Sequence, residues 1–204
     1  EALQLETIHG YYACVSFVDD LVGQVLDELD TLGIADNTII VFWGDHGFHL
    51  GDHGLWAKHT NIEQSARAPL IIAAPQLKIK NQATKSPSQF LDVFPTLCEI
   101  AEIQAPNAVE GKSLVPILKD ATAKVHNGVV TLKGSSCYAY RTERYRYVES
   151  YNKSSQVTNR LLFDYQKDPM ETINLAANPE HAALVKKLAA SMRAEVKGCK
   201  HLQN

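Results

Sequence analysis

The sequence has few cysteines, and none of them lie close together. Cys14, Cys98, Cys137 and Cys199 are spread over a chain of 204 residues, and no two of them form a C-x-x-C pair. Structural zinc sites and dithiol redox centres usually draw their ligands or thiols from such pairs. The spacing therefore argues against both kinds of site.

The sequence also lacks a long apolar run and an excess of charge. No stretch of roughly 18 apolar residues occurs, so we predict no membrane-spanning helix. The 20 basic and 23 acidic residues give a net charge of −3, which offers no basic surface to nucleic acid or to an anionic membrane. Neither is expected as a partner. Hydrophobic residues make up 45% of the chain, which is enough to form a buried core.

The N-terminal part of the chain has helical periodicity. Apolar residues recur three and four positions apart from Leu3 to Leu32, and one stripe contains Val15, Val18, Val22, Val25 and Leu29. Gly33 follows where a left-handed C-terminal cap is expected. We predict one long amphipathic helix over this range.

Two strands and a helix are predicted next. Residues 38–43, TIIVFW, are β-branched and aromatic without alternation, which is typical of a strand buried on both faces of a parallel sheet. A second apolar strand, Leu70–Ala74, lies between two prolines, and a helix from about Asp92 to Ile103 follows it. This order indicates an α/β arrangement, in which ligands bind beyond the carboxyl ends of the strands.

The composition changes in the second half of the chain. Pro, Gly, Lys and Asn are frequent between residues 106 and 129, so we predict two units, residues 1–124 and residues 125–204. In the second unit, tyrosines alternate on both sides of residues 142–144, which predicts an antiparallel hairpin, and residues 161–163 predict another strand.

The last predicted element is a helix. Asn178 is its expected N-cap, Pro179 its first residue, and Gly198 lies beyond its end. Its buried stripe is expected to contain Leu184, Leu188, Met192 and Val196. We therefore predict a small antiparallel sheet with one helix packed on it.

The run GDHGFHLGDHGLWAKH at residues 44–59 contains the tetrapeptide GDHG twice. It holds four of the eight histidines in the chain, which are His46, His49, His53 and His59. Two of these, His49 and His53, would share one face of a helix in the manner of a zinc site. Each glycine would cost such a helix about 1 kcal/mol relative to alanine, so we interpret the segment as a loop.

Within this loop, Asp45 and His46 come first after the predicted strand. A carboxylate next to an imidazole suits a divalent cation, although Asp45 could equally cap a turn while His46 bonds to the backbone. Lys58 fits an anion held jointly with such a cation, or is a solvated surface lysine. His53 and His59 either line a substrate cleft or make structural hydrogen bonds.

Several segments together resemble one enzyme family. Residues 41–47, 50–54, 56–58 and 68–71 resemble the downstream metal-site segment of the type I sulfatases, most closely the subgroup that includes iduronate-2-sulfatase. Further landmarks of this resemblance follow in the family's order at residues 11–19, 92–97, 111–114, 162–164 and 168–169. Each landmark is weak alone, but their order and spacing are specific.

The resemblance implies an alkaline-phosphatase-like α/β fold, with a mixed sheet flanked by helices and a small C-terminal antiparallel sheet with a packed helix. Residues 1–124 would be the C-terminal part of the catalytic domain. The implied activity is hydrolysis of sulfate esters, with Asp45 and His46 as calcium ligands and Lys58 in contact with the sulfate. A sulfated carbohydrate is the implied substrate, and an exported or lysosomal location is implied as well.

One landmark of the family is missing. The family's formylglycine nucleophile arises from a Cys/Ser-x-Pro-x-Arg motif, and none of the four cysteines begins such a motif. We therefore expect the nucleophile to lie in an N-terminal half of the same sulfatase. Two alternatives stay open: a phosphate or phosphonate ester hydrolase of the same superfamily, and a non-catalytic fragment that binds sulfated glycans.

Overall fold

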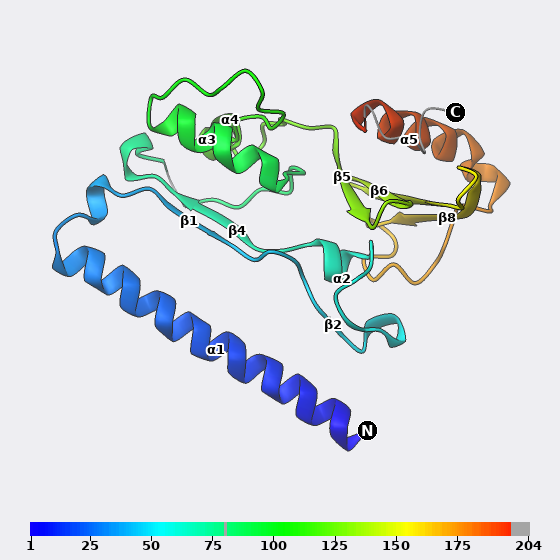
Figure 1. Ribbon diagram of the computed structural model, residues 1–204, viewed down its shortest axis with the longest axis horizontal. Helices are drawn as coiled ribbons and strands as arrows, with labels where there is room; N and C mark the ends of the chain where they lie inside the picture. The colour runs from blue at the N-terminus through cyan, green and yellow to red at the C-terminus, as the bar shows by residue number, and fades with distance from the viewer. Residues whose placement is uncertain (80, 197–204) are drawn as a thin grey trace.

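The computed structural model describes residues 1–79 and 81–196 (Figure 1). It opens with helix α1 (Ala2–Thr31), which ends at Leu32 and is followed by Gly33 with φ of 66°. The predicted helix and its glycine cap are confirmed. Among the described residues, no helix is both long enough and apolar enough to cross a membrane.

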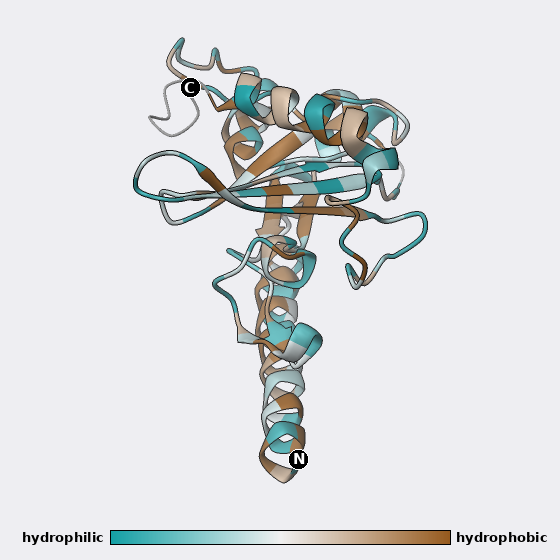
Figure 2. Ribbon diagram, turned by 90° about the vertical axis from the view of Figure 1, so that its right-hand side faces the viewer, coloured by the Kyte–Doolittle hydropathy of each residue, from teal (hydrophilic) through white to brown (hydrophobic). Residues whose placement is uncertain are grey.

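Helix α1 packs against very little of the described chain. None of its residues is buried, and side chains of the predicted stripe such as Val15, Val18 and Val25 are 50–64% exposed. Figure 2 shows α1 projecting from the rest of the molecule with apolar residues on its visible surface. Its neighbours are the short 3-10 turn η1 (Ala35–Asn37) and strand β2 (His49–Leu50). An amphipathic helix normally buries its apolar stripe, and this part of α1 is left uncovered.

The first sheet is a pair of strands, β1 (Ile40–Trp43) and β4 (Leu70–Ala73). Both predicted strands are confirmed, but the prediction of a parallel sheet buried on both faces is wrong for this pair. The strands run antiparallel, with Ile40 opposite Ala73, and Trp43 is 49% exposed. Parallel pairing usually needs a long crossover helix, and the only α-helix between β1 and β4 in the described chain is the four-residue α2 (Glu63–Ala66).

One face of this pair is covered by helices. The 3-10 turn η4 (Phe90–Asp92) leads into α3 (Val93–Ile100), and α4 (Val115–Lys119) lies beside α3 (Figure 1). A small apolar core forms there from Ala74, Ile100 and Val115, with Ile39, Ile72, Leu77 and Leu118 at its margin. The helix predicted from Asp92 is confirmed, although it ends at Ile100.

Asp92 ties three segments together beneath this core. Its side chain is fully buried and accepts hydrogen bonds from the backbone N–H groups of Gln89 and Lys112, each at 2.9 Å. The ring of His126 lies 2.9 Å from the same carboxylate. Buried carboxylates need such partners, so Asp92 fixes the loops before α3, before α4 and before the second sheet.

The second sheet is a four-stranded antiparallel meander. Its strands are β5 (Gly128–Lys133), β6 (Cys137–Thr142), β7 (Tyr145–Tyr151) and β8 (Val157–Asp164), in that spatial order. The predicted hairpin around residues 142–144 and the predicted strand at 161–163 are confirmed. The boundary between residues 124 and 125 falls in the loop before β5, and the division into two domains stays a prediction.

Helix α5 (Ala182–Glu195) covers one face of this sheet (Figure 1). The Asn178 side chain accepts the N–H of Glu180 at 3.0 Å, as predicted, but residues Pro179–His181 form a 3-10 turn before the helix begins. The core contains Tyr138, Tyr140, Tyr147, Tyr151, Leu162, Leu188, Ala189 and Met192, and Leu184 and Val196 pack at its edge. The predicted stripe is therefore confirmed, while Gly198 lies outside the described residues.

A buried carboxylate joins this sheet to α5. Glu149 is fully buried and accepts hydrogen bonds from Tyr147 Oη at 2.6 Å, Arg193 Nη2 at 2.7 Å and Arg160 Nε at 3.1 Å, as well as from Tyr151. Burial raises the pKa of Glu149, but these donors outweigh burial and hold the pKa below its ordinary value of 4.5. Glu149 therefore stays charged in the folded protein.

We predict that Glu149→Gln lowers the free energy of unfolding by about 3 kcal/mol at neutral pH, because the two arginines lose their buried counter-charge. Because the pKa of Glu149 is lower in the folded protein than its unfolded value of 4.5, the charged carboxylate stabilises the fold at pH values above 4.5. This stabilisation is lost as the pH falls through the folded-state pKa. The difference in the free energy of unfolding between wild type and variant should therefore become smaller below pH 4.5. Chemical denaturation across this pH range measures it, and a constant difference would contradict the prediction.

Candidate active site

His46 follows β1 directly and presents one ring nitrogen as an acceptor. Its Nδ1 lies 2.7 Å from the carbonyl oxygen of Gly47. A carbonyl can only accept, so Nδ1 carries the proton and Nε2 keeps a free lone pair. In metal sites, a hydrogen bond at one ring nitrogen fixes the tautomer in which the other nitrogen is the ligand. The backbone at Gly47 therefore prepares Nε2 of His46 for this role.

Asp45 places a carboxylate oxygen next to that nitrogen. Asp45 Oδ2 lies 3.4 Å from His46 Nε2, and the Asp45 side chain is 82% exposed. Two ligands about 2.4 Å from one calcium ion, in adjacent coordination positions, lie about 3.4 Å apart. The pair therefore fits two neighbouring positions around a cation. No cluster of three or more His, Cys, Asp or Glu side chains suited to a metal occurs among the described residues, so the pair alone is an incomplete ligand set.

A short hairpin returns Lys58 to the same place. Strands β2 (His49–Leu50) and β3 (Trp56–Ala57) pair antiparallel, and Lys58 Nζ lies 2.5 Å from His46 Nε2. An ammonium and a metal ion cannot use the same lone pair and repel each other unless an anion lies between them. The sequence predicted that Asp45, His46 and Lys58 act together, and the structure brings the three together at the end of β1.

The other histidines of the loop lie elsewhere. His53 has φ of 56° in the 3-10 turn η2 (Asp52–Gly54), and both His53 and His59 are exposed. Within the described chain, neither is hydrogen-bonded to Asp45, His46 or Lys58. His49 is fully buried, and its Nε2 lies 2.7 Å from Thr60 Oγ1. The interpretation of residues 44–59 as a loop instead of a zinc-binding helix is confirmed.

The two GDHG copies have different structural roles. Gly47, which closes the first copy, donates its N–H to the carbonyl of Ser65 at 2.9 Å, and a Cβ added to it would lie 2.0 Å from the carbonyl oxygen of Gln64. Gly54, which closes the second copy, has φ of 69° and open space around it. The first copy needs glycine to pack against α2, whereas the second needs it to turn the chain.

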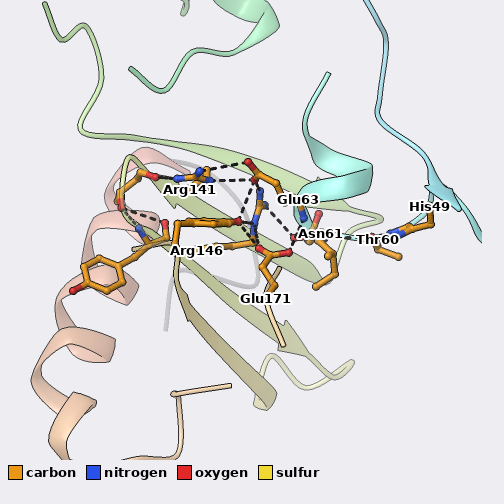
Figure 3. A network of polar contacts seen from close by, with 11 residues as sticks. His49, Thr60, Asn61, Glu63, Arg141, Arg146 and Glu171 are labelled. Atoms are coloured by element: carbon orange, nitrogen blue, oxygen red, sulfur yellow. Dashed lines mark hydrogen bonds and ion pairs between the residues drawn. The ribbon is translucent and has the colours of Figure 1, made fainter. Parts of the chain in front are cut away.

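Sequence reasoning missed the residues just beyond Lys58. Glu63, the first residue of α2, is ion-paired with Arg141 and Arg146 of the C-terminal sheet (Figure 3). Burial raises the pKa of Glu63, but the two arginines outweigh burial and hold the pKa below its ordinary value. The alternation of β6 and β7 places both arginines on the face away from the tyrosine core, which is a local signal for a buried acid. No local pattern identifies a partner so far upstream in the chain.

Comparison with known proteins identifies the family. Residues 51–198 match the family model described as N-sulphoglucosamine sulphohydrolase, C-terminal. The chain belongs to the sulfatase family. A sulfatase of Formosa agariphila is 37% identical over 183 residues, which cover 90% of this chain but only 35% of the relative. The chain thus spans about a third of the length of this sulfatase.

Solved structures of related enzymes have a similar fold. One neighbour, a complex with its substrate D-glucosamine-2-N,6-O-disulfate, has a TM-score of 0.75 and 27% identity over 93% of this chain and 41% of its own. The phosphonate monoester hydrolase of Agrobacterium radiobacter also has a TM-score of 0.75, with 26% identity over 91% of this chain and 40% of its own. The alkaline-phosphatase-like fold is therefore confirmed, while the iduronate-2-sulfatase-like subgroup stays a prediction.

We predict that Gly47→Ala in the full-length protein lowers any affinity of the Asp45 and His46 pair for calcium at least tenfold, because α2 must move away from a Cβ that would meet a backbone oxygen at 2.0 Å. Overpacking of this kind costs about 3 kcal/mol of stability. The matched change Gly54→Ala costs about 1 kcal/mol for its left-handed backbone and should leave calcium binding unchanged. Calorimetric titration with calcium and thermal unfolding measure both effects. Equal calcium affinities in the two variants would contradict the prediction.

Proposed function

We propose that the complete gene product is a calcium-dependent sulfatase that hydrolyses sulfate esters of a carbohydrate. One observation carries this proposal: Asp45 Oδ2, His46 Nε2 and Lys58 Nζ converge at the carboxyl end of β1. Asp45 and His46 would hold the cation, and Lys58 would donate to a sulfate oxygen. Family membership and the sulfated-sugar complex of a structural neighbour support the substrate class.

Membership of the sulfatase family favours calcium, because one carboxylate and one imidazole would by themselves also suit zinc. Calcium binds mainly oxygen ligands, so a site with one imidazole nitrogen and one carboxylate is completed by further oxygens, including those of the sulfate. A calcium ion held by Asp45 and His46 would act as a Lewis acid that polarises the sulfate oxygens. Lys58 adds a charge-assisted hydrogen bond on the same anion, which fixes its orientation. His53 and His59 are both exposed, and we propose that they contact the carbohydrate part of the substrate.

We infer that an N-terminal portion of the same gene product completes the site and supplies the formylglycine nucleophile. The uncovered apolar surface supports this: Leu3, Phe17 and Val25 of α1 are 64–74% exposed, and Ile71 of β4 is 59% exposed. Among the described residues, β1 and β4 each pair on one edge only, so both outer edges can accept further strands. Contiguous exposed apolar surface of this kind marks an interface. An exported or lysosomal location is part of the proposal.

A phosphate or phosphonate ester hydrolase is the second candidate, favoured by the likeness to the phosphonate monoester hydrolase of Agrobacterium radiobacter. The same three groups would hold a phosphoryl group instead of a sulfate. Comparing kcat/KM for paired sulfate and phosphonate esters of one alcohol decides between the two. A protein that binds sulfated glycans but hydrolyses neither ester would instead be the non-catalytic alternative.

The two aspartates of the GDHG copies provide a matched test of the metal site. We predict that Asp45→Ala weakens calcium binding at least tenfold in calorimetric titration and abolishes most sulfate release. Asp52→Ala, the same change in the second copy, should leave both near wild type. Sulfate release should stop on chelation and return when calcium is added. If Asp45→Ala bound calcium as tightly as Asp52→Ala, Asp45 would not be a ligand.

Lys58 can be tested through substrate kinetics. Loss of one hydrogen bond to a charged group costs about 2 kcal/mol, so we expect Lys58→Ala to lower kcat/KM for a sulfated sugar by about 30-fold. Lys133→Ala, the same change at an exposed lysine of β5, is the control and should leave kcat/KM near wild type. Similar losses in the two variants would contradict a direct contact between Lys58 and the sulfate.

A further inference from the structure

The segment from Thr60 to Ala66 joins the candidate site to the C-terminal sheet, and we call it the bridging segment. On one side it contacts the loop that carries His46 and Lys58. On the other it contacts a buried cluster of charged residues from β6, β7 and the loop after β8 (Figure 3). Interactions that hold the bridging segment in place therefore also hold the loop that carries His46 and Lys58.

The contacts on the site side are short and specific. Ser65 accepts the N–H of Gly47 at 2.9 Å, and Gly47 in turn holds Nδ1 of His46. Thr60 Oγ1 lies 2.7 Å from the buried His49 ring, and the N–H of Thr60 donates to the carbonyl of Lys58 at 2.7 Å. A shift of the bridging segment would thus displace both the imidazole and the lysine backbone.

The contacts on the sheet side centre on Glu63. Arg141 and Arg146 lie directly opposite each other on β6 and β7, where two like charges repel. The Glu63 carboxylate accepts from both guanidinium groups, with Arg141 Nε at 3.1 Å. Because the Arg146 side chain is only 2% exposed, its charge needs this partner in the folded protein.

The backbone of the bridging segment is held by the same cluster. Arg146 Nη1 donates to the carbonyl of Asn61 at 3.1 Å. The N–H of Glu63 donates to Glu171 Oε2 at 2.8 Å, and the other oxygen of the fully buried Glu171 side chain pairs with Arg146 Nε at 2.8 Å. Arg141 stacks on the Tyr165 ring at 3.7 Å. Glu63 is thus anchored through its side chain and its backbone at once.

We propose that Glu63 is a positioning residue of the sulfatase site: its pairing with Arg141 and Arg146 locks the bridging segment, and this segment sets the geometry of His46 and Lys58. This inference rests on the proposed function for its kinetic consequence but not for its structural one. It gives the C-terminal sheet a role in setting the geometry of the site.

The test compares two buried glutamates that pair with different arginines: Glu63 with Arg141 and Arg146, and Glu149 with Arg160 and Arg193. Glu63→Gln removes the charge between Arg141 and Arg146, while Glu149→Gln removes the charge between Arg160 and Arg193 on the α5 face of the same sheet. Both changes should lower the melting temperature of the full-length protein. Only Glu63→Gln should speed hydrogen exchange of the amides of residues 44–60, by about tenfold or more, and weaken calcium binding in calorimetric titration by a similar factor.

Kinetics give a second readout. Glu63→Gln should lower kcat/KM for a sulfated sugar about tenfold, and Glu63→Asp, which keeps the charge, should recover part of the loss. If Glu63→Gln does not fold, Arg141→Met is the alternative variant. It removes an arginine whose side chain is 22% exposed, and Arg146 remains as the buried ion-pair partner of Glu63. The same pattern of faster exchange in residues 44–60 is expected for it.

The inference fails if Glu63→Gln and Glu149→Gln change hydrogen exchange in residues 44–60 equally. This outcome is distinct from failure of the proposed function. If the wild-type protein bound no calcium or released no sulfate, the proposed function would be wrong, yet the exchange measurement would still decide whether Glu63 positions the loop.

Discussion

The ion pair between Glu63 and Arg146 joins the two halves of this structure. Arg146 is almost wholly buried in the C-terminal sheet, and a buried guanidinium group is stable only with a charged or hydrogen-bonding partner at each of its nitrogens. Glu63, Glu171 and the carbonyl of Asn61 supply these partners, and two of the three lie in the segment just beyond Lys58. Because the buried Arg146 needs these partners, the segment that follows Lys58 is held against the C-terminal sheet.

Glycine makes the other end of this connection possible. Gly47 lies so close to α2 that no side chain fits, and this contact lets the backbone hold His46 in a fixed tautomer. The second GDHG copy has no such contact and only reverses the chain into β3. Two identical tetrapeptides thus differ in structural role, because Gly47 of the first copy packs against α2, whereas Gly54 of the second copy has open space around it.

The apolar surface of α1 and of the β1–β4 pair sets a second constraint. These residues have the composition of buried elements, yet the described chain covers only the side packed by α3 and α4. The C-terminal sheet, in contrast, has a closed core beneath α5. The C-terminal sheet and α5 thus enclose a core of their own, whereas α1 and the β1–β4 pair leave apolar surface uncovered by the described residues. The chain spans about a third of the length of a related sulfatase.

The sequence by itself determined the elements that depend on local periodicity and on short motifs. Helix α1, strands β1, β4 and β8, the tyrosine hairpin of β6 and β7, and the stripe of α5 follow from side-chain spacing, whereas strands β2, β3 and β5 were not predicted. The grouping of Asp45, His46 and Lys58 follows from motif order. The antiparallel pairing of β1 with β4, the exposure of α1 and the Glu63 cluster were decided only by the tertiary structure. These features join residues far apart in the chain, and a buried charge finds its partner by position in space, for which local spacing carries no signal.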